Sequence, residues 1–267
     1  MNDIKSDLQM MVHDFGEAVK EIKIYHIADV HTGAAEARQE KFLDFLSWIK
    51  GQKDSYIALA GDIANNATRS SVSNVFDEVM RPREQKRFIA DALEPVKGKI
   101  LCMIEGNHER RSGKDADDSF MYDIACKLDL EDVYRENIAF IHLKMGKEKR
   151  QAGRRHSFSI AVTHGAGGGM LSGATINRNE RFSDHIEGVD ALLVAHSHKA
   201  MGSRIARLSV NLQKGTIRTR ETVILTACPW MDWGGYAAQK MMRPSPASIT
   251  YLVLDASGEK KRIRLVI

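Results

Sequence analysis

The feature that most constrains this fold is a series of short apolar runs that each end in Asp, Gly or His. They occupy residues 23–29, 55–62, 99–108, 157–164 and 191–198. Runs of this length and composition are typical of buried strands. Residues 34–50 and 73–96 have the apolar spacing of helices, the second broken at Pro82, and residues 117–130 predict a further helix. Strands that alternate with helices predict βαβ units, whose right-handed crossovers bring the strand C-termini to one edge of a sheet.

The second half of the chain has a different pattern. It contains four apparent strands separated only by turns, at residues 204–212, 216–227, 248–255 and 260–267. This pattern predicts an antiparallel sheet. The sequence has no linker and no shift in composition, so we expect a single domain over residues 1–267, with residues 1–20 as an N-terminal extension or helix. The last strand leaves an edge that could pair with another subunit, so an oligomer is one expectation.

Composition sets limits on location and partners. Lys and Arg total 39 against 35 Asp and Glu, and the net charge of +4 permits a nucleic-acid partner without implying one. Cys102, Cys126 and Cys228 form no C-x-x-C pair, which suits a reducing compartment and predicts a cytoplasmic protein. Charges interrupt the N-terminal apolar positions, unlike a signal peptide, and no apolar window has the length of a transmembrane helix. We therefore expect no membrane partner.

The polar residues that end the first set of strands carry the chemistry. The five blocks are Asp29-Val-His31, Gly61-Asp62, Gly106-Asn107-His108-Glu109, Thr163-His164-Gly165 and His196-Ser197-His198. Alternate residues of an extended strand share a face, so Asp29 and His31 are expected to face one ion, as are His196 and His198. Imidazole nitrogens mixed with carboxylate and amide oxygens suit Mn, Fe, Zn, Co or Ni. The lack of thiolates argues against a structural zinc site.

Each block alone has an ordinary structural explanation. An Asp at a strand end is commonly a turn residue or a helix cap, and a single His is more often a core or surface residue than a ligand. The ordered set D-x-H, G-D, G-N-H-E, H-G and H-x-H, however, resembles the calcineurin-like metallophosphoesterase superfamily, over roughly residues 22–200. Residues 74–111 are also similar to phosphoesterases carried by phages and mobile elements.

The resemblance implies an α/β (α+β) fold, a four-layered αββα sandwich of two mixed sheets with a dinuclear metal site at the C-terminal edge of the strands. It implies two divalent ions, with manganese expected first and Fe, Zn, Ni or Co as alternatives. By position, the first ion takes Asp29, His31 and His198, the second takes Asn107, His164 and His196, and the Asp62 carboxylate bridges both.

The implied reaction agrees with the chemistry of these residue types. His108 matches the catalytic histidine of the superfamily rather than a ligand. Two ions about 3.5–4 Å apart share and acidify a water, which attacks phosphorus as hydroxide. His108, next to the ligand Asn107, is then placed to protonate the leaving oxygen or to stabilise its charge.

One position departs from part of the superfamily. In the related protein serine/threonine phosphatases the second block reads G-D-x-x-D followed by arginine, and the extra Asp partners the catalytic histidine. Here Asn65 takes the place of that Asp, and Asn66 that of the arginine. An amide can orient His108, but it cannot stabilise an imidazolium as a carboxylate does. Asn65 is therefore expected to act beside His108, and a protein phosphatase is disfavoured.

Phosphodiesters are the expected substrates. Arg110 and Arg111, together with Asn107, could grip a phosphate oxygen, although a solvated helix start is the simpler explanation for the arginines. The basic run at 144–155 could follow a nucleic-acid backbone or be a solvated turn. Residues 229–236 offer aromatic side chains for a substrate wall, with hydrophobic packing as the default alternative.

The predicted protein is thus a metal-dependent, nuclease-like phosphodiesterase acting on DNA, RNA, a nucleotide or a cyclic nucleotide. A broad phosphomonoesterase is the alternative, since the same residues would serve a cleft that admits only a terminal phosphate. A scaffold without activity, known among relatives that have lost ligands, is disfavoured because no ligand position is missing here, and converging histidines have no evident packing purpose.

Overall fold

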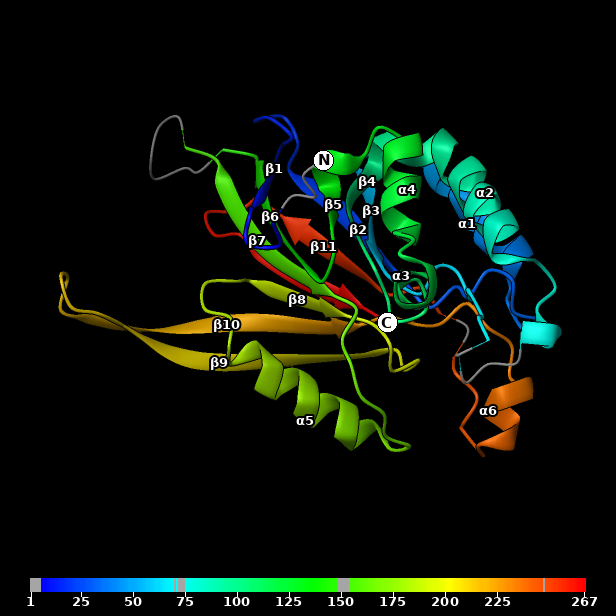
Figure 1. Cartoon of the computed structure of the whole chain (residues 1–267). Coiled ribbons are helices and arrows are strands. Elements are labelled where there is room, and N and C mark those ends of the chain that lie inside the picture. The colour runs from blue at the N-terminus through cyan, green and yellow to red at the C-terminus, as the bar shows by residue number, and fades with distance from the viewer. Residues whose placement is uncertain (1–5, 70, 72–74, 148–153, 247) are drawn as a thin grey trace.

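The computed structural model describes residues 6–69, 71, 75–147, 154–246 and 248–267, which form two mixed six-stranded sheets packed face to face (Figure 1). The sheet that we call the β3 sheet has the order β12-β11-β2-β3-β4-β5. Its strands are β2 (Glu21–Ile27), β3 (Ser55–Ala60), β4 (Ile100–Ile104), β5 (Tyr134–Arg135), β11 (Tyr251–Asp255) and β12 (Arg262–Val266). The strands β2 to β5 are parallel to one another, as the βαβ pattern predicts.

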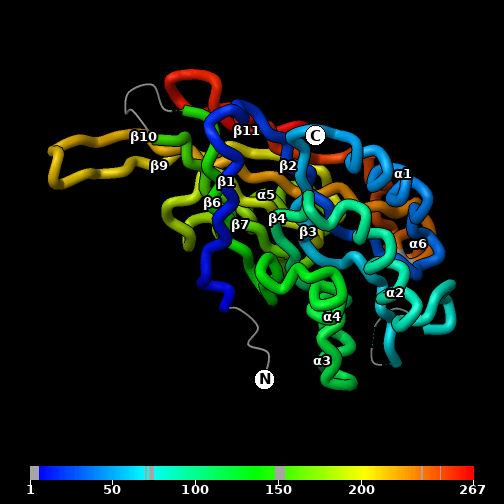
Figure 2. The backbone as a smooth tube through the Cα atoms, turned by 90° about the horizontal axis from the view of Figure 1, so that it is seen from above, coloured from blue at the N-terminus to red at the C-terminus, as the bar shows by residue number. Residues whose placement is uncertain are grey.

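The second sheet, the β7 sheet, has the order β1-β6-β7-β8-β10-β9. Its strands are β1 (Met11–Asp14), β6 (Ile138–Met145), β7 (His156–Thr163), β8 (Ala191–Val194), β9 (Met201–Asn211) and β10 (Thr216–Thr226). The strands β9 and β10 form a long hairpin that extends beyond the rest of the molecule (Figure 2).

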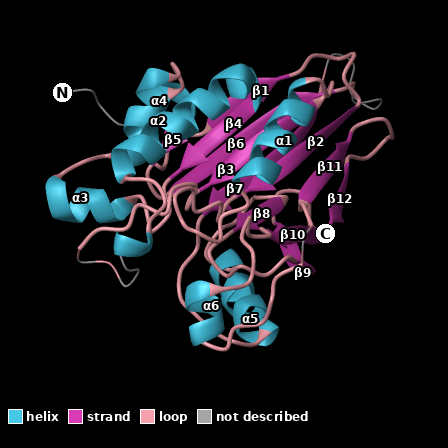
Figure 3. Ribbon diagram, turned by 90° about the vertical axis from the view of Figure 1, so that its right-hand side faces the viewer, coloured by secondary structure: helices cyan, strands magenta, loops and turns pink. Residues whose placement is uncertain are grey.

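Helices complete the four layers. They are α1 (Gln39–Lys50), α2 (Pro82–Leu93), α3 (Arg110–Ala116), α4 (Phe120–Lys127), α5 (Ser172–Ser183) and α6 (Gly235–Gln239). Apolar residues of α1, α2 and α4 pack on the outer face of the β3 sheet (Figure 3), whereas α5 lies on the β7 sheet. The four-layered αββα arrangement of two mixed sheets is therefore confirmed.

Alternation along the strands explains this layering. In β3, Ala58 and Ala60 face the core between the sheets, while Ile57 and Leu59 lie beneath the helices. Both faces are covered, so the strand reads as a continuous apolar run rather than an alternating one. The small alanines admit the side chains of the opposite sheet at close range.

Three expectations about elements were wrong in part. The strands of the second half do not form one antiparallel sheet: β10 runs parallel to β8 in the β7 sheet, whereas β11 joins β2 in the β3 sheet. Residues 11–14, expected in an extension or helix, form β1, which pairs with β6. Pro82 begins α2 rather than breaking a longer helix, because proline suits the first helical turn, where no N–H bond is lost.

Candidate metal centre

The loops that follow the strands turn through left-handed backbone at the predicted ligands. The φ angles are 53° at Asp29, 51° at His31, 52° at Asp62, 67° at His196 and 54° at His198. Residues other than glycine seldom adopt such angles, and they gather at functional sites that the surrounding fold holds in place. These residues lie beyond the strand ends, so the expectation that alternation on an extended strand aligns them was wrong; the left-handed turns align them instead.

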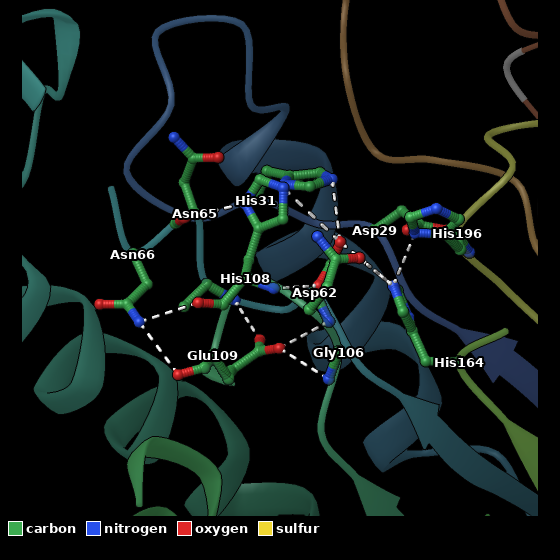
Figure 4. A network of polar contacts seen from close by, with 12 residues as sticks. Asp29, His31, Asp62, Asn65, Asn66, Gly106, His108, Glu109, His164 and His196 are labelled. Atoms are coloured by element: carbon green, nitrogen blue, oxygen red, sulfur yellow. Dashed lines mark hydrogen bonds and ion pairs between the residues drawn. The ribbon is translucent and has the colours of Figure 1, made fainter. Parts of the chain in front are cut away.

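Asp62 lies at the centre of the imidazoles (Figure 4). Its Oδ2 is 3.2 Å from Nε2 of His164, 3.8 Å from Nε2 of His108 and 4.0 Å from Nε2 of His31. Its Oδ1 accepts a hydrogen bond of 2.9 Å from the N–H of His108. One carboxylate oxygen is thus anchored to the backbone, and the other faces side chains that come from both sheets.

The donor atoms converge in a way that suits cations. Nε2 of His31 lies 3.1 Å from Nε2 of His198, and Nε2 of His164 lies 3.1 Å from Oδ1 of Asn107. Oδ1 of Asp29 is buried without a hydrogen-bond donor among the described residues, 3.5 Å from Nε2 of His198. Neighbouring imidazole nitrogens and a buried carboxylate oxygen without a hydrogen-bond donor are groups that a bound cation can stabilise. The residues present therefore fit bound divalent ions.

The donor atoms fall into overlapping groups, each within 4.8 Å of one another. One group contains Asp29, His31 and His198, the residues predicted for the first ion. Another contains His164 and His196, two of the three residues predicted for the second ion, together with Asp62, the predicted bridge. A third group contains His108 with His31 and Asp62. Distance alone therefore does not separate His108 from the other imidazoles, but an arginine N–H points at its Nε2.

Both ring nitrogens of His108 have protein partners. Nδ1 lies 2.8 Å from the backbone carbonyl of Asn65, and an N–H of the Arg111 guanidinium points at Nε2 from 2.9 Å. Since arginine only donates, Nε2 accepts and Nδ1 carries the proton donated to Asn65. Burial lowers the pKa of His108 to about 4, and the positive Arg111 adds to this effect although Asp62 opposes it.

The Asn65 side chain does not orient His108, contrary to expectation. Its amide donates instead to Oε1 of Glu78, while Oε2 of Glu78 accepts from Gln85. Asn65 reaches His108 only through its backbone carbonyl, which also accepts an N–H from Arg111 at 2.9 Å. Any residue at this position presents that carbonyl. The side chain of residue 65 therefore acts through its hydrogen bond to Glu78 and not through contact with His108.

The two arginines after the G-N-H-E block are placed differently. Arg111 contacts His108 and Asn65, whereas Arg110 donates to the carbonyl of Glu136 at 3.0 Å. The two residues are neighbours in the first turn of α3, where successive side chains point about 100° apart. Only Arg111 therefore lies against the candidate centre.

Charges in the centre compensate one another. Burial alone would raise the pKa of the Asp62 carboxyl, but the charges of His164, His108 and His31 hold it well below its usual range. Burial likewise opposes the proton on His164, yet Asp62 and Asp29 outweigh it and raise the pKa of His164 to about 9. Because a metal ligand must be a neutral imidazole, a cation would take the place of that proton.

Sequence reasoning missed the clamp that holds the loops together. The buried Glu109 carboxylate accepts backbone N–H bonds of 2.9 Å each from Asp62, Ala64 and Gly106. The close approach also needs Gly106, where a Cβ would lie 2.0 Å from Oδ1 of Asp62. The only sequence signal was the glutamate of the G-N-H-E block, and two of its three partners are 45 and 47 residues distant.

The remaining candidate segments are only partly in place. Trp230 is buried against Phe42 and Phe45, as hydrophobic packing predicts, whereas Trp233 is exposed. The basic run at 144–155 connects the antiparallel strands β6 and β7, but residues 148–153 of it lie outside the described residues. Among the described helices, none combines the length and the apolar character needed to cross a membrane.

Solved structures of other proteins are similar to this chain, and two of them are named here. One is a conserved uncharacterised protein, a predicted phosphoesterase, from Streptococcus pneumoniae TIGR4, with 10% identity, a TM-score of 0.37, and coverage of 93% of this chain and 99% of that one. The other is a single mutant of Vps29 from Entamoeba histolytica, with 12% identity, a TM-score of 0.31, and coverage of 92% and 98%.

A search of curated proteins finds no match to the sequence. The family model for calcineurin-like phosphoesterases matches residues 22–200, which is more than half of the chain and includes all five strand-end blocks. The chain therefore belongs to the calcineurin-like phosphoesterase family.

Proposed function

We propose that this protein is a dinuclear-metal phosphodiesterase that hydrolyses a phosphodiester of nucleic acid, a nucleotide or a cyclic nucleotide. Family membership supports metal-dependent phosphoester hydrolysis in general. The observation that carries the proposal is the pair of donor triads beside His108, with Asp62 between them. Such a set, supplied by the loops of both sheets, has no use in packing alone.

The ligand roles follow from the groups of donor atoms. Asp29, His31 and His198 would hold one ion, Asn107, His164 and His196 the other, and Asp62 would contact both. When bound, two divalent ions supply Lewis-acid activation of water and of the phosphoryl oxygens. Manganese is the first choice for this nitrogen and oxygen set, with Fe, Zn, Ni and Co as alternatives.

His108 is proposed to protonate the leaving oxygen. Its Nδ1–H donates to the carbonyl of Asn65, which fixes the ring in either protonation state. Donation from Nε2 requires a second proton on the ring, which the lowered pKa of His108, about 4, opposes before substrate binds and which an incoming phosphoryl group would favour. Arg111 must then leave Nε2, because two donors cannot share one hydrogen bond.

When substrate binds, the Arg111 guanidinium is proposed to release Nε2 of His108 and to donate instead to a non-bridging oxygen of the phosphate. The guanidinium lies half-buried beside the imidazole, and its planar fork matches two phosphate oxygens. Arg110, which we had expected to share this role, is bound to Glu136 and is assigned to holding α3. Recruitment of Arg111 to the anion would free Nε2 at the moment of substrate binding.

Location and assembly are proposals as well. The free thiols of Cys102 and Cys228 are buried and that of Cys126 is partly buried, which is consistent with a reducing, cytoplasmic setting. DNA or RNA is the proposed macromolecular substrate. β12 is an edge strand of the β3 sheet, which leaves pairing with a second copy open to measurement.

The test is hydrolysis of bis(p-nitrophenyl) phosphate beside p-nitrophenyl phosphate, with Mn, Zn, Ni or chelator. The diester should be cleaved faster, and only with metal. His108→Ala should lower kcat by about 100-fold or more for a diester with a poor leaving group, the usual value of a positioned general acid. The loss should be smaller for p-nitrophenolate, which leaves without a proton. Asp62→Asn should abolish metal-dependent turnover, since the position between both triads loses its negative charge.

Arg111→Ala should raise KM for the diester by about 10-fold or more, while the neighbouring Arg110→Ala serves as the matched control and leaves KM unchanged. Faster cleavage of the monoester would favour the phosphomonoesterase instead. Unchanged hydrolysis in Asp62→Asn would contradict the ligand assignment, and full turnover by His108→Ala with a poor leaving group would contradict the proton-donor role.

A further inference from the structure

The segment between β10 and β11 joins two loops of the candidate metal centre. At its start, the N–H of Trp230 donates to the carbonyl of Asp29 at 3.0 Å. Further on, the hydroxyl of Ser245 donates to the carbonyl of His198 at 2.6 Å. Asp29 and His198 belong to the same donor triad. The segment Trp230–Ser245, here called the rim segment, therefore borders one side of the centre.

Trp233 is the exposed aromatic residue of the rim segment. It is 53% exposed, whereas Trp230, three residues earlier, is 8% exposed and packs in the core. Three residues span at most about 10 Å of chain, so Trp233 stays near the loop of Asp29. Its indole N–H donates to the carbonyl of Met242 at 2.7 Å, which satisfies the polar edge and fixes the ring. The exposed part is therefore a flat apolar surface, held in place before any ligand binds.

Two cations lie beside the loops that carry His164 and His198. Lys199 follows His198 directly and donates to the carbonyl of Gly169, and Arg178 donates to the carbonyl of Gly168 at 3.1 Å. Neither cation has a carboxylate partner among the hydrogen bonds and ion pairs of the described residues. The rim segment thus supplies a fixed aromatic face, and the two cations outside it supply positive charge. Proteins that bind single-stranded nucleic acids use this combination, stacking the bases on the aromatic side chain and attracting the backbone with the charge.

We propose that Trp233 is a base-stacking platform, so that the substrate of the centre is a phosphodiester with a nucleobase attached. This inference rests on the proposed function and deepens it. A nucleobase stacked on Trp233 would place its own phosphate toward Asp29 and His198, with the next phosphate of a strand near Lys199. Stacking is tolerant of base identity because every base has a π-face, so little sequence preference follows.

A protein or lipid partner explains the rim less well. The exposed Met241 and Met242 lie in the same segment as Trp233, but Lys199 and Arg178 near the centre add charge that an apolar partner would not need. The position beside a donor triad ties this surface to the reacting phosphate. A docking surface for a protein would have no need to border that triad.

The first experiment measures binding without hydrolysis. In chelator, tryptophan fluorescence of the Trp48→Phe protein is titrated with hexathymidylate and with an abasic hexamer of the same charge. This background removes the exposed indole of α1 and leaves Trp230 in the core. The thymidine strand should quench the fluorescence and bind more tightly than the abasic strand, by roughly 5- to 150-fold for one stacked base. With a 5′-fluorescein on each strand, whose anisotropy reports binding without a tryptophan signal, Trp233→Ala should remove that difference, and Trp233→Phe should restore part of it.

The second experiment measures turnover. The substrates are the p-nitrophenyl ester of thymidine 5′-phosphate and methyl p-nitrophenyl phosphate, which share a leaving group and differ in the base. Trp233→Ala should raise KM only for the thymidine ester, by about 10-fold, whereas Trp48→Ala, the matched exposed tryptophan, should change neither. A dithymidylate titrated beside the hexamer distinguishes a nucleotide from a strand as the source of the base.

Equal affinity for thymidine and abasic strands, or a preference that survives in Trp233→Ala, would overturn the stacking proposal. The failure of the proposed function looks different: neither ester is hydrolysed with any metal, while the fluorescence difference remains. Hydrolysis of both esters with no effect of Trp233→Ala would leave a phosphodiesterase whose base contact lies elsewhere.

Discussion

At residue 65 an amide serves where related phosphatases have a carboxylate, and the structure supplies a physical reason. The Asn65 amide donates to Glu78, and Glu78 also accepts from Gln85, whose own Oε1 accepts the backbone N–H of Asn66 at 2.9 Å. The carboxylate that holds the loop after β3 is thus that of Glu78, which binds the amide of Asn65, rather than a carboxylate at residue 65 itself. His108 then takes its orientation from a backbone carbonyl.

The change Asn65→Asp should therefore destabilise this protein. It would set a second carboxylate against Glu78, whose pKa is already raised by burial. The lost donor and the added repulsion should lower the free energy of unfolding by about 1–3 kcal/mol in urea denaturation. The double variant Asn65→Asp, Glu78→Gln should recover most of it, because the new amide can donate to the new carboxylate.

Asn65→Ala is the control, since it removes the hydrogen bond without adding charge and should cost less. The carbonyl of residue 65 remains in every variant, so His108 should keep its orientation. A stable Asn65→Asp protein, or a double variant no better than the single one, would show that Glu78 does not determine the choice of residue at this position.

At the scale of elements, the sequence predicts the strands better than their partners. The runs at 55–62 and 157–164 correspond to β3 and β7 because buried strands with covered faces are continuously apolar. The assignment of β9 to β12 to two different sheets depends on long-range pairing, which no local pattern encodes. Convergence of the strand-end blocks was predictable from topology, but the left-handed turns that achieve it were not.

The helix α5 shows a second limit of local reasoning. Its buried face consists of Thr175, Asn179 and Ser183, spaced by four residues. Small polar residues give this face no apolar periodicity that would predict a helix from sequence. The face is held on the sheet by polar contact instead, since Asn179 donates to Thr226 of β10 at 3.2 Å. The different placement of Arg110 and Arg111 is equally invisible in sequence, because it depends on how the first turn of α3 is rotated against β4.

The outer part of the hairpin of β9 and β10 supplies no residue to the candidate metal centre. This part extends away from the rest of the molecule (Figures 1 and 2). It exposes Leu208, Val210, Leu212 and Ile217 by 61–89%. Val210 pairs with Ile217 and Leu208 pairs with Thr219, so these side chains share one face. A two-stranded ribbon is marginally stable alone, and such an apolar face favours association.

Shortening this hairpin should leave the centre intact. Arg207 and Arg220 are paired, so replacing residues 208–219 by Asn-Gly gives a two-residue turn between them and keeps the ion pair of Arg207 with Asp184. We expect unchanged metal content and diester hydrolysis, with weaker retention on a hydrophobic column. Loss of hydrolysis in a folded shortened protein would instead assign the hairpin a role in substrate binding.

At the scale of the whole molecule, the candidate centre joins the two sheets. The loops after β2, β3 and β4 provide Asp29, His31, Asp62 and Asn107, whereas the loops after β7 and β8 provide His164, His196 and His198. Bound ions would therefore link the layers as well as activate a substrate. Ligands that bind only the folded state add about 2.7 kcal/mol at a hundredfold excess over Kd.

Chelation should thus lower Tm, and by an amount that depends on pH. Without ions the raised pKa of His164, about 9, contributes stability that is fully present below its unfolded value of 6.5 and is lost as pH rises through 9. That contribution is at most about 3 kcal/mol. With ions, binding improves over the same range because the imidazole must be neutral. The difference in Tm between loaded and chelated protein should therefore widen from pH 6.5 to 9.

Scanning calorimetry with Mn or chelator across this range checks the prediction. At roughly 2–4 °C per kcal/mol for a chain of this size, the chelated protein should lose several degrees between the ends of the range. His164→Asn is the matched control: it removes the titrating group, so its chelated Tm should change less with pH. A gap in Tm that narrows with rising pH would mean that His164 neither holds the proton in the empty centre nor gives way to an ion.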